Sequence, residues 1–232
     1  MTIAENVRKL REEMEAAALA SGRDPGEILL CAATKMNDAQ RVREAIAAGV
    51  DCCGENRVQE LLQKQAEDAY AGCPVHFIGH LQTNKAAKVV GAVSLIASVD
   101  RLGLLEQIDR LAAKKGIRQD ILFEVNIGME PQKSGFTEEE TRQLAADMGK
   151  YPNVCLHGLM AIPPAAEKKG DNLRYFEKMR NLYVDIIEKK YDNISMDCLS
   201  MGMTDDFADA IACGSTMVRV GTAIFGARDY QK

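Results

Sequence analysis

Short apolar segments alternate with longer amphipathic segments along almost the whole chain. Several of the apolar segments are hydrophobic at every position instead of at every second one. Strands that are covered on both faces show this pattern, whereas strands with one face in water alternate. The pattern predicts eight buried strands, at residues 28–35, 51–56, 75–80, 94–100, 120–127, 154–162, 195–201 and 216–221.

Each predicted strand is followed by a segment with helical periodicity. In the clearest one, residues 171–190, the side chains of Leu173, Phe176, Met179 and Tyr183 fall on one helical face. The others are expected at 38–48, 56–69, 83–90, 101–115, 137–149 and 206–213, with a short one from Thr222. A further amphipathic helix at 3–18 precedes the first strand and ends at Ser21-Gly22.

Strict alternation of strand and helix implies parallel strands joined by right-handed crossovers. Eight such units predict an α/β fold that closes into a single (β/α)8 TIM barrel, with the first helix as an extra element. The length of 232 residues agrees with the ~250 residues typical of such barrels. An open, doubly wound parallel sheet is the alternative. Because no linker or repeat interrupts the pattern, we expect residues 1–232 to form one domain.

Composition excludes several classes of partner. The net charge is −5 and the pI is about 5.4, so no overall basic field attracts nucleic acid or an anionic membrane. No segment reaches the ~20 consecutive apolar residues of a membrane-spanning helix. The charged N-terminal segment lacks the apolar centre of a signal peptide, so we expect a cytoplasmic protein.

Seven cysteines are present without any CxxC pair, which predicts reduced core thiols instead of disulfides. Adjacent Cys52 and Cys53 would point to opposite faces of a strand and so would not share a metal ion. The histidines His76, His80 and His157 show no ligand spacing with carboxylates. No metal site is expected.

Lys35 closes the first apolar strand and should therefore stand at the carboxyl-terminal mouth of the barrel, where such folds bind ligands. Partial burial there would depress the pKa of an amine, and a neutral amine is the form that attacks an aldehyde to give an imine. The alternative is a lysine that merely extends to solvent from a strand end.

The last two strand–helix loops have the composition of a phosphate cradle. Gly202 and Gly221 permit close backbone approach, and Ser200 and Thr222 offer hydroxyl donors at the start of short helices. Asp205 or Asp206 is expected to cap the helix that follows the first of these loops. Loops that only cap a helix and bind no phosphate would have the same composition. Together with an imine-forming lysine, the cradle narrows the ligand to pyridoxal phosphate (PLP) or a phosphorylated sugar.

Several strings of residues resemble one known family nearly from end to end. They are LLCAATK around Lys35, GENRVQELLQK (54–64), HFIGHLQTNK (76–85), VNIGMEPQKSGF (125–136), GLMAIPP (158–164) and the long string at 199–230. On these residues the chain resembles the YggS/PROSC family of pyridoxal phosphate homeostasis proteins. Thr34, Cys53 and Val75 depart from the usual residues of that family but remove no cofactor contact.

The resemblance implies a barrel like the N-terminal domain of bacterial alanine racemases, with PLP bound to Lys35 as a Schiff base. It implies that Ser200, Gly221 and Thr222 bind the phosphate and that Arg219 faces the pyridine nitrogen. Asn56 and His80 are weaker candidates for lining the pocket. Asn56 could instead be a helix cap, and Arg219 could instead form a salt bridge at a strand end.

An arginine opposite the ring nitrogen disfavours a proton there, and PLP is then a weak electron sink. Racemases related to the family take a second base from a separate C-terminal domain, and we expect none here because the chain ends at Lys232, just after the barrel. The preferred interpretation is a monomeric PLP carrier or regulator in vitamin B6 homeostasis that affects amino-acid pools without turnover. Apo forms of PLP-dependent enzymes are the expected recipients.

Two enzymatic alternatives remain open at this point. One is a fold-type III PLP-dependent amino-acid racemase. The other is a Schiff-base aldolase for a sugar phosphate, which borohydride fixation of PLP on Lys35 would exclude. The roles of the loops at 128–136 and 163–171 do not follow from the sequence, although the second is a candidate lid.

Overall fold

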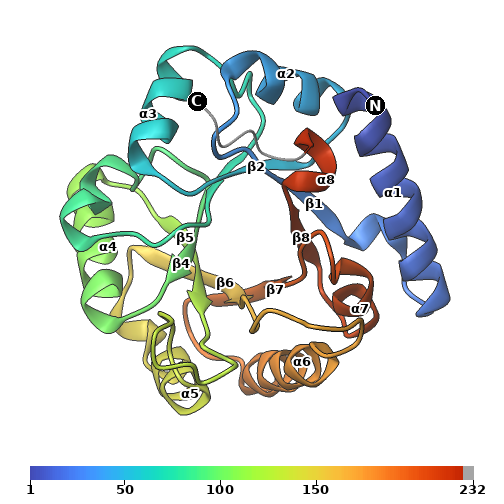
Figure 1. Cartoon of the computed structure of the whole chain (residues 1–232). Coiled ribbons are helices and arrows are strands. Elements are labelled where there is room, and N and C mark those ends of the chain that lie inside the picture. The colour runs from blue at the N-terminus through green and yellow to red at the C-terminus, as the bar shows by residue number, and fades with distance from the viewer. Residues whose placement is uncertain (227–232) are drawn as a thin grey trace.

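Eight parallel strands close into a barrel in which their order around the ring follows the sequence (Figure 1). The computed structural model describes residues 1–226, and the last six residues of the expected domain, 227–232, lie outside the described residues. The strands are β1 (Leu29–Ala33), β2 (Cys52–Glu55), β3 (Val75–Phe77), β4 (Leu95–Val99), β5 (Gln119–Glu124), β6 (Val154–Met160), β7 (Ile194–Ser200) and β8 (Met217–Val220). Because β1 pairs with β8, the (β/α)8 prediction is confirmed and the open sheet is wrong.

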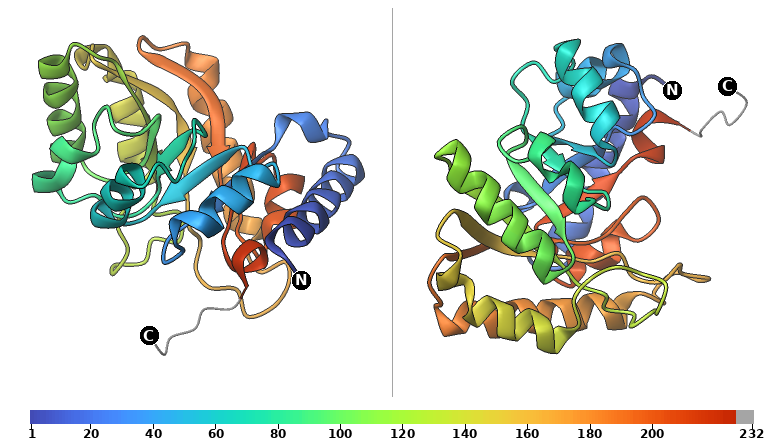
Figure 2. Two further views of the ribbon diagram at one scale, coloured as in Figure 1. Left: turned by 90° about the horizontal axis from the view of Figure 1, so that it is seen from above. Right: turned by 90° about the vertical axis from the view of Figure 1, so that its left-hand side faces the viewer.

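Helices follow the strands and form the outer layer of the barrel (Figure 2). They are α1 (Ile3–Ala20), α2 (Ala39–Ala47), α3 (Val58–Ala66), α4 (Leu102–Lys115), α5 (Glu138–Ala146), α6 (Leu173–Lys189), α7 (Phe207–Ala212) and α8 (Thr222–Phe225). Short 3-10 helices lie at Pro25–Glu27, Thr83–Lys88 and Met148–Lys150. Within the described part of the chain, no helix is long and apolar enough to cross a membrane.

The segment after β3 was predicted to be an α-helix but forms a 3-10 helix. Thr83–Lys88 is a 3-10 helix where an α-helix was expected at 83–90. Lys115 of α4 reaches across and donates from Nζ to the carbonyl oxygens of Ala87 and Val90. A side chain from a neighbouring helix therefore satisfies carbonyls that a longer α-helix would have bonded to its own backbone.

The extra helix α1 covers the seam where β8 meets β1. It begins with a capping box, in which the Thr2 hydroxyl accepts from Glu5 N and the Glu5 carboxylate accepts from Thr2 N. Its buried side chains pack with those of α2, α7 and α8, and Figures 1 and 2 show α1 alongside α7. The helix thus shields the closure of the barrel from solvent with its apolar face, in agreement with the amphipathic helix predicted at 3–18.

The barrel has two distinct apolar regions. Outward side chains of the strands pack beneath the helices, whereas inward ones form a separate interior cluster that includes Cys31, Cys52, Leu122 and Met217. The expectation for the adjacent cysteines is confirmed, because Cys52 belongs to the interior and Cys53 to the outer layer. Burial on both faces explains why the strands are apolar throughout.

Candidate functional site at the barrel mouth

Lys35 lies just beyond the end of β1, in a turn at the carboxyl-terminal mouth of the barrel. The strand ends at Ala33, two residues earlier than expected, because the chain turns once Thr34 N has donated to Gly54 O. Lys35 is half-buried there. Ala32 pairs with Val220 of β8, so Lys35 and the Gly221-Thr222 step leave neighbouring strands at the same end of the barrel.

Close packing joins these two strand ends. A Cβ atom on Gly221 would lie 3.4 Å from the carbonyl oxygen of Ala33, which is van der Waals contact, so the backbones of β8 and β1 lie side by side here. Gly221 is also the N-cap of α8, and Thr222, the first residue of that helix, is exposed. The structure therefore brings together the predicted lysine and one of the two predicted cradle loops.

A buried network of polar side chains fixes the backbone immediately before Lys35. The Thr34 hydroxyl donates to the carboxylate of Glu55, which is fully buried. Lys64 Nζ, from α3, lies 2.6 Å from Glu55 Oε1 and 2.7 Å from the Thr34 carbonyl oxygen. Tyr70 donates to the same carboxylate oxygen. The network holds the turn that carries Lys35 against β2 and α3.

Arg219 of β8 and Ser200 at the end of β7 meet on the side of the barrel that adjoins β1. The guanidinium of Arg219 is buried and donates from Nη1 to Ser200 Oγ at 2.5 Å and from Nη2 to the Ala161 carbonyl oxygen at 2.9 Å. Burial lowers the pKa of Arg219, but an arginine remains a cation in proteins. Ser200 accepts from Arg219, so its hydroxyl hydrogen can still point to another acceptor.

The loop after β7 is held tightly to β8 and α7. Gly202 has a φ of +92°, and a Cβ there would lie 2.6 Å from the Ala210 Cβ, so this position requires glycine. The Gly202 carbonyl accepts from Arg219 N. Asp206 does occupy the N-cap position of α7, but its carboxylate does not accept from the first N–H groups of that helix. It accepts from Met203 N at 2.7 Å and from Asn172 Nδ2, which tightens the loop instead.

Asn56 and His80, the two weaker candidates, both lie at strand ends around the mouth. The N-cap of α3 is Arg57, so Asn56 is not the cap of that helix. Its Oδ1 atom is buried and accepts no hydrogen bond from the described residues. His80 is exposed, with Nδ1 2.9 Å from Asp100 Oδ2 and 3.4 Å from Ser134 Oγ.

The loop at 128–136 is tied to its neighbours in the mouth. The side chain of Asn126 donates to the carbonyl oxygens of Glu130 and Lys133 and accepts from Glu130 N. Lys133 Nζ donates to the Pro163 carbonyl at 3.1 Å, which links this loop to the segment at 163–171. The two loops that the sequence could not interpret are thus connected to each other on one side of the mouth.

Glu124 is a functional candidate that the sequence analysis missed. It ends β5 in the same mouth, and burial raises the pKa of its carboxyl to about 7, reinforced by Asp100 and opposed by Arg219. A carboxyl group that titrates near neutrality can hold or release a proton there. Its signal was present in the sequence as a charge between the apolar residues ILF and Val125 of the string DILFEVNI.

The pKa of Glu124 predicts a pH-dependent stability. The folded protein binds this proton more tightly than the unfolded chain, whose carboxyl has a pKa of 4.5. The stabilising contribution is therefore complete below pH ~4.5 and is lost as the pH rises through ~7, by up to about 3 kcal/mol. Glu124→Gln should flatten the decline in unfolding free energy over this window in denaturant titrations. Glu139→Gln, on the exposed face of α5, should leave the decline unchanged, and an equal slope in all three proteins would contradict the prediction.

The fold and the mouth together define a class, the (β/α)8 barrels of the alanine racemase N-terminal type. The family model described as "Alanine racemase, N-terminal domain" matches residues 2–229. An alanine racemase structure from Clostridium difficile 630 superposes with a TM-score of 0.75 at 16% identity, covering 98% of this chain and 58% of that one, and this likeness concerns the fold alone.

Nearer relatives identify the family within that class. The pyridoxal phosphate homeostasis protein of Pseudomonas aeruginosa is 42% identical over 230 residues, which cover 99% of this chain and 97% of the relative. The structure of PipY from Synechococcus elongatus PCC7942, described with PLP bound, has a TM-score of 0.84 at 33% identity and covers 97% of this chain and 100% of that one. The chain belongs to the family of pyridoxal phosphate homeostasis proteins.

Proposed function

We propose that this protein binds PLP as a Schiff base on Lys35 and acts as a carrier or regulator in vitamin B6 homeostasis. The observation that carries the proposal is the closure of the barrel, in which β1 and β8 bring Lys35 beside Gly221 and Thr222. The PLP-bound relative supports the choice of cofactor. The sugar-phosphate aldolase has no comparable support.

The residues of the mouth fit PLP by their chemistry. The hydroxyls of Ser200 and Thr222 and the backbone near Gly202 and Gly221 would hold the phosphate. Asn56 Oδ1, buried with no donor among the residues described, fits a polar ligand group. Lys35 supplies the amine, and the network beneath it keeps its backbone in place.

The protein itself then limits the reactivity of the bound cofactor. PLP supplies an aldehyde carbon and a ring that accepts electrons best when its nitrogen is protonated. On the proposed assignment Arg219 would face that nitrogen and would disfavour the proton, because two positive charges would meet in a buried site. Within residues 1–226 its side-chain hydrogen bonds go to the neutral oxygens of Ser200 and Ala161 and to no carboxylate. A cofactor that is held but poorly activated suits a carrier.

Replacing Arg219 by glutamate is expected to reverse this effect. In Arg219→Glu the absorption of bound PLP should change with pH over the range in which the ring nitrogen gains its proton, whereas the wild type and Arg219→Lys should show no such step. The measurement is a spectrophotometric pH titration of the three proteins with PLP bound. Identical titrations of wild type and Arg219→Glu would refute the assignment of Arg219 to the ring nitrogen.

Exchange of the α-hydrogen separates a carrier from an enzyme. The protein loaded with PLP is incubated with single L-amino acids in deuterated water, and the amino acids are analysed by mass spectrometry and on a chiral column. If the protein is a carrier, the amino acids should gain deuterium no faster with the loaded protein than with free PLP. Fast incorporation with racemisation would overturn the carrier proposal and favour the racemase.

One observation favours that racemase alternative. The Glu124 carboxyl, with a pKa of about 7, lies in the same mouth and could take or return a proton at neutral pH. If turnover is found, Glu124→Gln should abolish it, and retention of turnover in this variant would remove the basis for a role of Glu124.

The physiological setting also belongs to this proposal. We take the protein to act in the cytoplasm as a monomer, with residues 1–232 as one domain, and to deliver PLP to apo forms of PLP-dependent enzymes. Mixing the loaded protein with an apo aminotransferase in the presence of a trap for free PLP tests delivery, because reactivation should persist despite the trap. Analytical ultracentrifugation measures the oligomeric state and so tests whether the protein is a monomer.

A further inference from the structure

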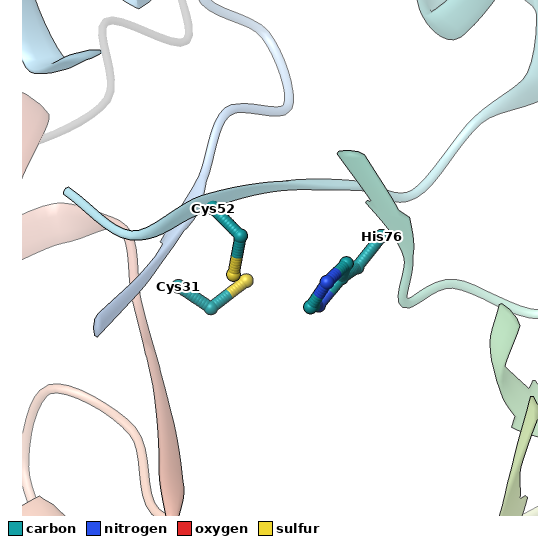
Figure 3. Close-up of side chains that lie close together, drawn as sticks. All are labelled: Cys31, Cys52 and His76. Carbon is teal, nitrogen blue, oxygen red and sulfur yellow. The ribbon is translucent and has the colours of Figure 1, made fainter. Parts of the chain in front are cut away.

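Three metal-ligating side chains meet inside the barrel, on strands that neighbour one another. Cys31 of β1, Cys52 of β2 and His76 of β3 project into the barrel interior, with both sulfurs and the imidazole turned toward one another (Figure 3). One ligand atom from each residue lies within 4.8 Å of the other two. Cys31 and Cys52 are partners in the β1–β2 register, which explains why their side chains share a level.

Burial and an unpaired nitrogen distinguish this group from ordinary core residues. Cys31 is fully buried, Cys52 is 2% exposed and His76 is 7% exposed. His76 Nδ1 is buried and has no hydrogen-bond partner within residues 1–226. A buried polar atom without a partner destabilises the fold, so such atoms are rare unless a ligand satisfies them.

The protonation state of the imidazole favours coordination. Burial lowers the pKa of His76 to about 4, so the ring is neutral at physiological pH and keeps a lone pair available for a ligand. The hydrogen bond between the thiols, together with burial, raises the pKa of Cys52, so a metal ion would have to displace these protons.

An entry path leads to this group from the end of the barrel opposite Lys35. His76 lines a cavity of about 360 Å³ together with residues that immediately precede strands, among them Pro74, Ser94 and Thr216. These residues mark the amino-terminal end of the barrel. Water from the cavity can supply a fourth ligand beside the three protein atoms, as tetrahedral coordination requires.

We propose that Cys31, Cys52 and His76 bind a thiophilic divalent metal ion, Zn²⁺, in the interior of the barrel. Zn–S and Zn–N bonds of about 2.3 and 2.1 Å place the sulfurs of a tetrahedral site about 3.8 Å apart, so small side-chain rotations suffice. Two thiolates, a neutral imidazole and Zn²⁺ sum to zero charge, which minimises the cost of burial. With a monovalent cation the same three ligands would leave the site with a net negative charge.

A second group of potential ligands lies near the same cavity and serves as the comparison. Asp120, Cys155 and His157 also approach within coordination distance of one another, but they are partly exposed. Both nitrogens of His157 already lie about 3 Å from carboxylates, Nε2 3.1 Å from Asp120 and Nδ1 3.0 Å from Asp197. No unpaired atom there points to a missing ligand, so we assign the metal to the interior group.

Metal titration of the chelator-treated, reduced full-length protein tests this assignment. Co²⁺ should bind with a stoichiometry of one and give thiolate-to-cobalt charge-transfer absorption, which Zn²⁺ should abolish by displacement. Binding should release about two protons per ion near pH 7, measured with a pH indicator. Absence of stoichiometric binding, or binding of Cu⁺ without Zn²⁺ or Co²⁺, would overturn the proposal.

Variants locate the site. Cys31→Ser, Cys52→Ser and His76→Ala should each weaken Zn²⁺ binding by more than the roughly 100-fold that loss of an outer-sphere partner can cost. Cys155→Ser and His157→Ala should leave it unchanged, and the opposite pattern would place the metal in the second group. X-ray absorption of the zinc-loaded wild type, which depends on no variant, should show two sulfur ligands. One or no sulfur would exclude the site, whatever the outcome for PLP.

Discussion

Lys35→Ala should lose all covalent attachment of PLP. After incubation with PLP and reduction by borohydride, the wild type should carry one pyridoxyl group per chain, identified by mass spectrometry of the peptide that contains Lys35. The variant should carry none, because a Schiff base needs a primary amine and the alanine offers no nucleophile. The absorption of the imine should disappear with it.

Some PLP should remain in Lys35→Ala without a covalent bond. The phosphate contacts expected from Ser200, Gly221 and Thr222 do not involve the amine, so weak binding that dialysis removes is expected. Fluorescence titration measures this residual affinity. The backbone of the turn should stay in place because Thr34, Glu55 and Lys64 bond to one another beneath it.

Lys133→Ala is the matched control for this experiment. Lys133 belongs to a mouth loop and donates to the Pro163 carbonyl, so it is another lysine that lies near the mouth. Its loss should leave the stoichiometry of fixed PLP at one. If Lys35→Ala kept a full covalent equivalent of PLP, or if Lys133→Ala lost it, the amine would be wrongly assigned and the proposed function would lose its chemical centre.

The sequence allowed the barrel to be predicted because each strand is covered on both faces. Continuous apolar strings, separated by helices with a 3.6-residue period, have few other interpretations when eight of them occur in one chain. The ends of elements were less certain. The chain turns after Thr34 because the ladder with β2 stops there, and this depends on a neighbouring strand that periodicity does not describe.

Some residues at the mouth of the barrel were predicted from the sequence and others were missed. Lys35, Arg219 and the two glycine loops could be found because the fold sends the carboxyl ends of its strands to a common face. Glu124 was missed because the strand was predicted to run to residue 127, which placed Glu124 inside it, whereas β5 ends at Glu124. Its raised pKa arises from burial and from Asp100, which directly follows the adjacent strand β4 and which only the folded chain brings close.

The interior cysteine and histidine group could not be found from spacing. Parallel neighbours are separated by a whole crossover helix, so Cys31, Cys52 and His76 lie more than twenty residues apart in sequence. The sequence argument considered only the adjacent pair Cys52 and Cys53, which do point to opposite faces. Short metal-binding sequence motifs identify ligands that lie close together in the sequence, on loops and hairpins. They do not identify ligands that lie on successive strands of a barrel.

The charge of Lys64 lies inside the protein. Its side chain is 5% exposed and its Nζ lies 2.6 Å from Glu55 Oε1, whose own side chain is fully buried. The pair is further joined by Thr34 and Tyr70. Such a pair contributes little net stability relative to an apolar pair, but removing one partner leaves the other charge buried and uncompensated.

Lys64→Met should therefore destabilise the protein by about 3–5 kcal/mol, a large share of the ~5–15 kcal/mol that stabilises a typical domain. The ammonium ion is lost, while the Glu55 carboxylate keeps only the hydroxyls of Thr34 and Tyr70 as donors. Equilibrium unfolding in urea measures the loss. Because the same ammonium ion donates to the Thr34 carbonyl, the turn that carries Lys35 should also loosen, which hydrogen exchange of residues 34–37 would detect.

Two matched variants make this prediction sharp. Glu55→Leu combined with Lys64→Met removes both charges and should recover most of the lost stability, since no buried ion remains. Lys9→Met, which breaks the exposed pair with Glu13 on α1, should have no measurable effect. If Lys64→Met proved as stable as Lys9→Met, or if the double variant were no more stable than Lys64→Met, the Glu55 carboxylate would not depend on Lys64, and the turn before Lys35 would have to be held by other contacts.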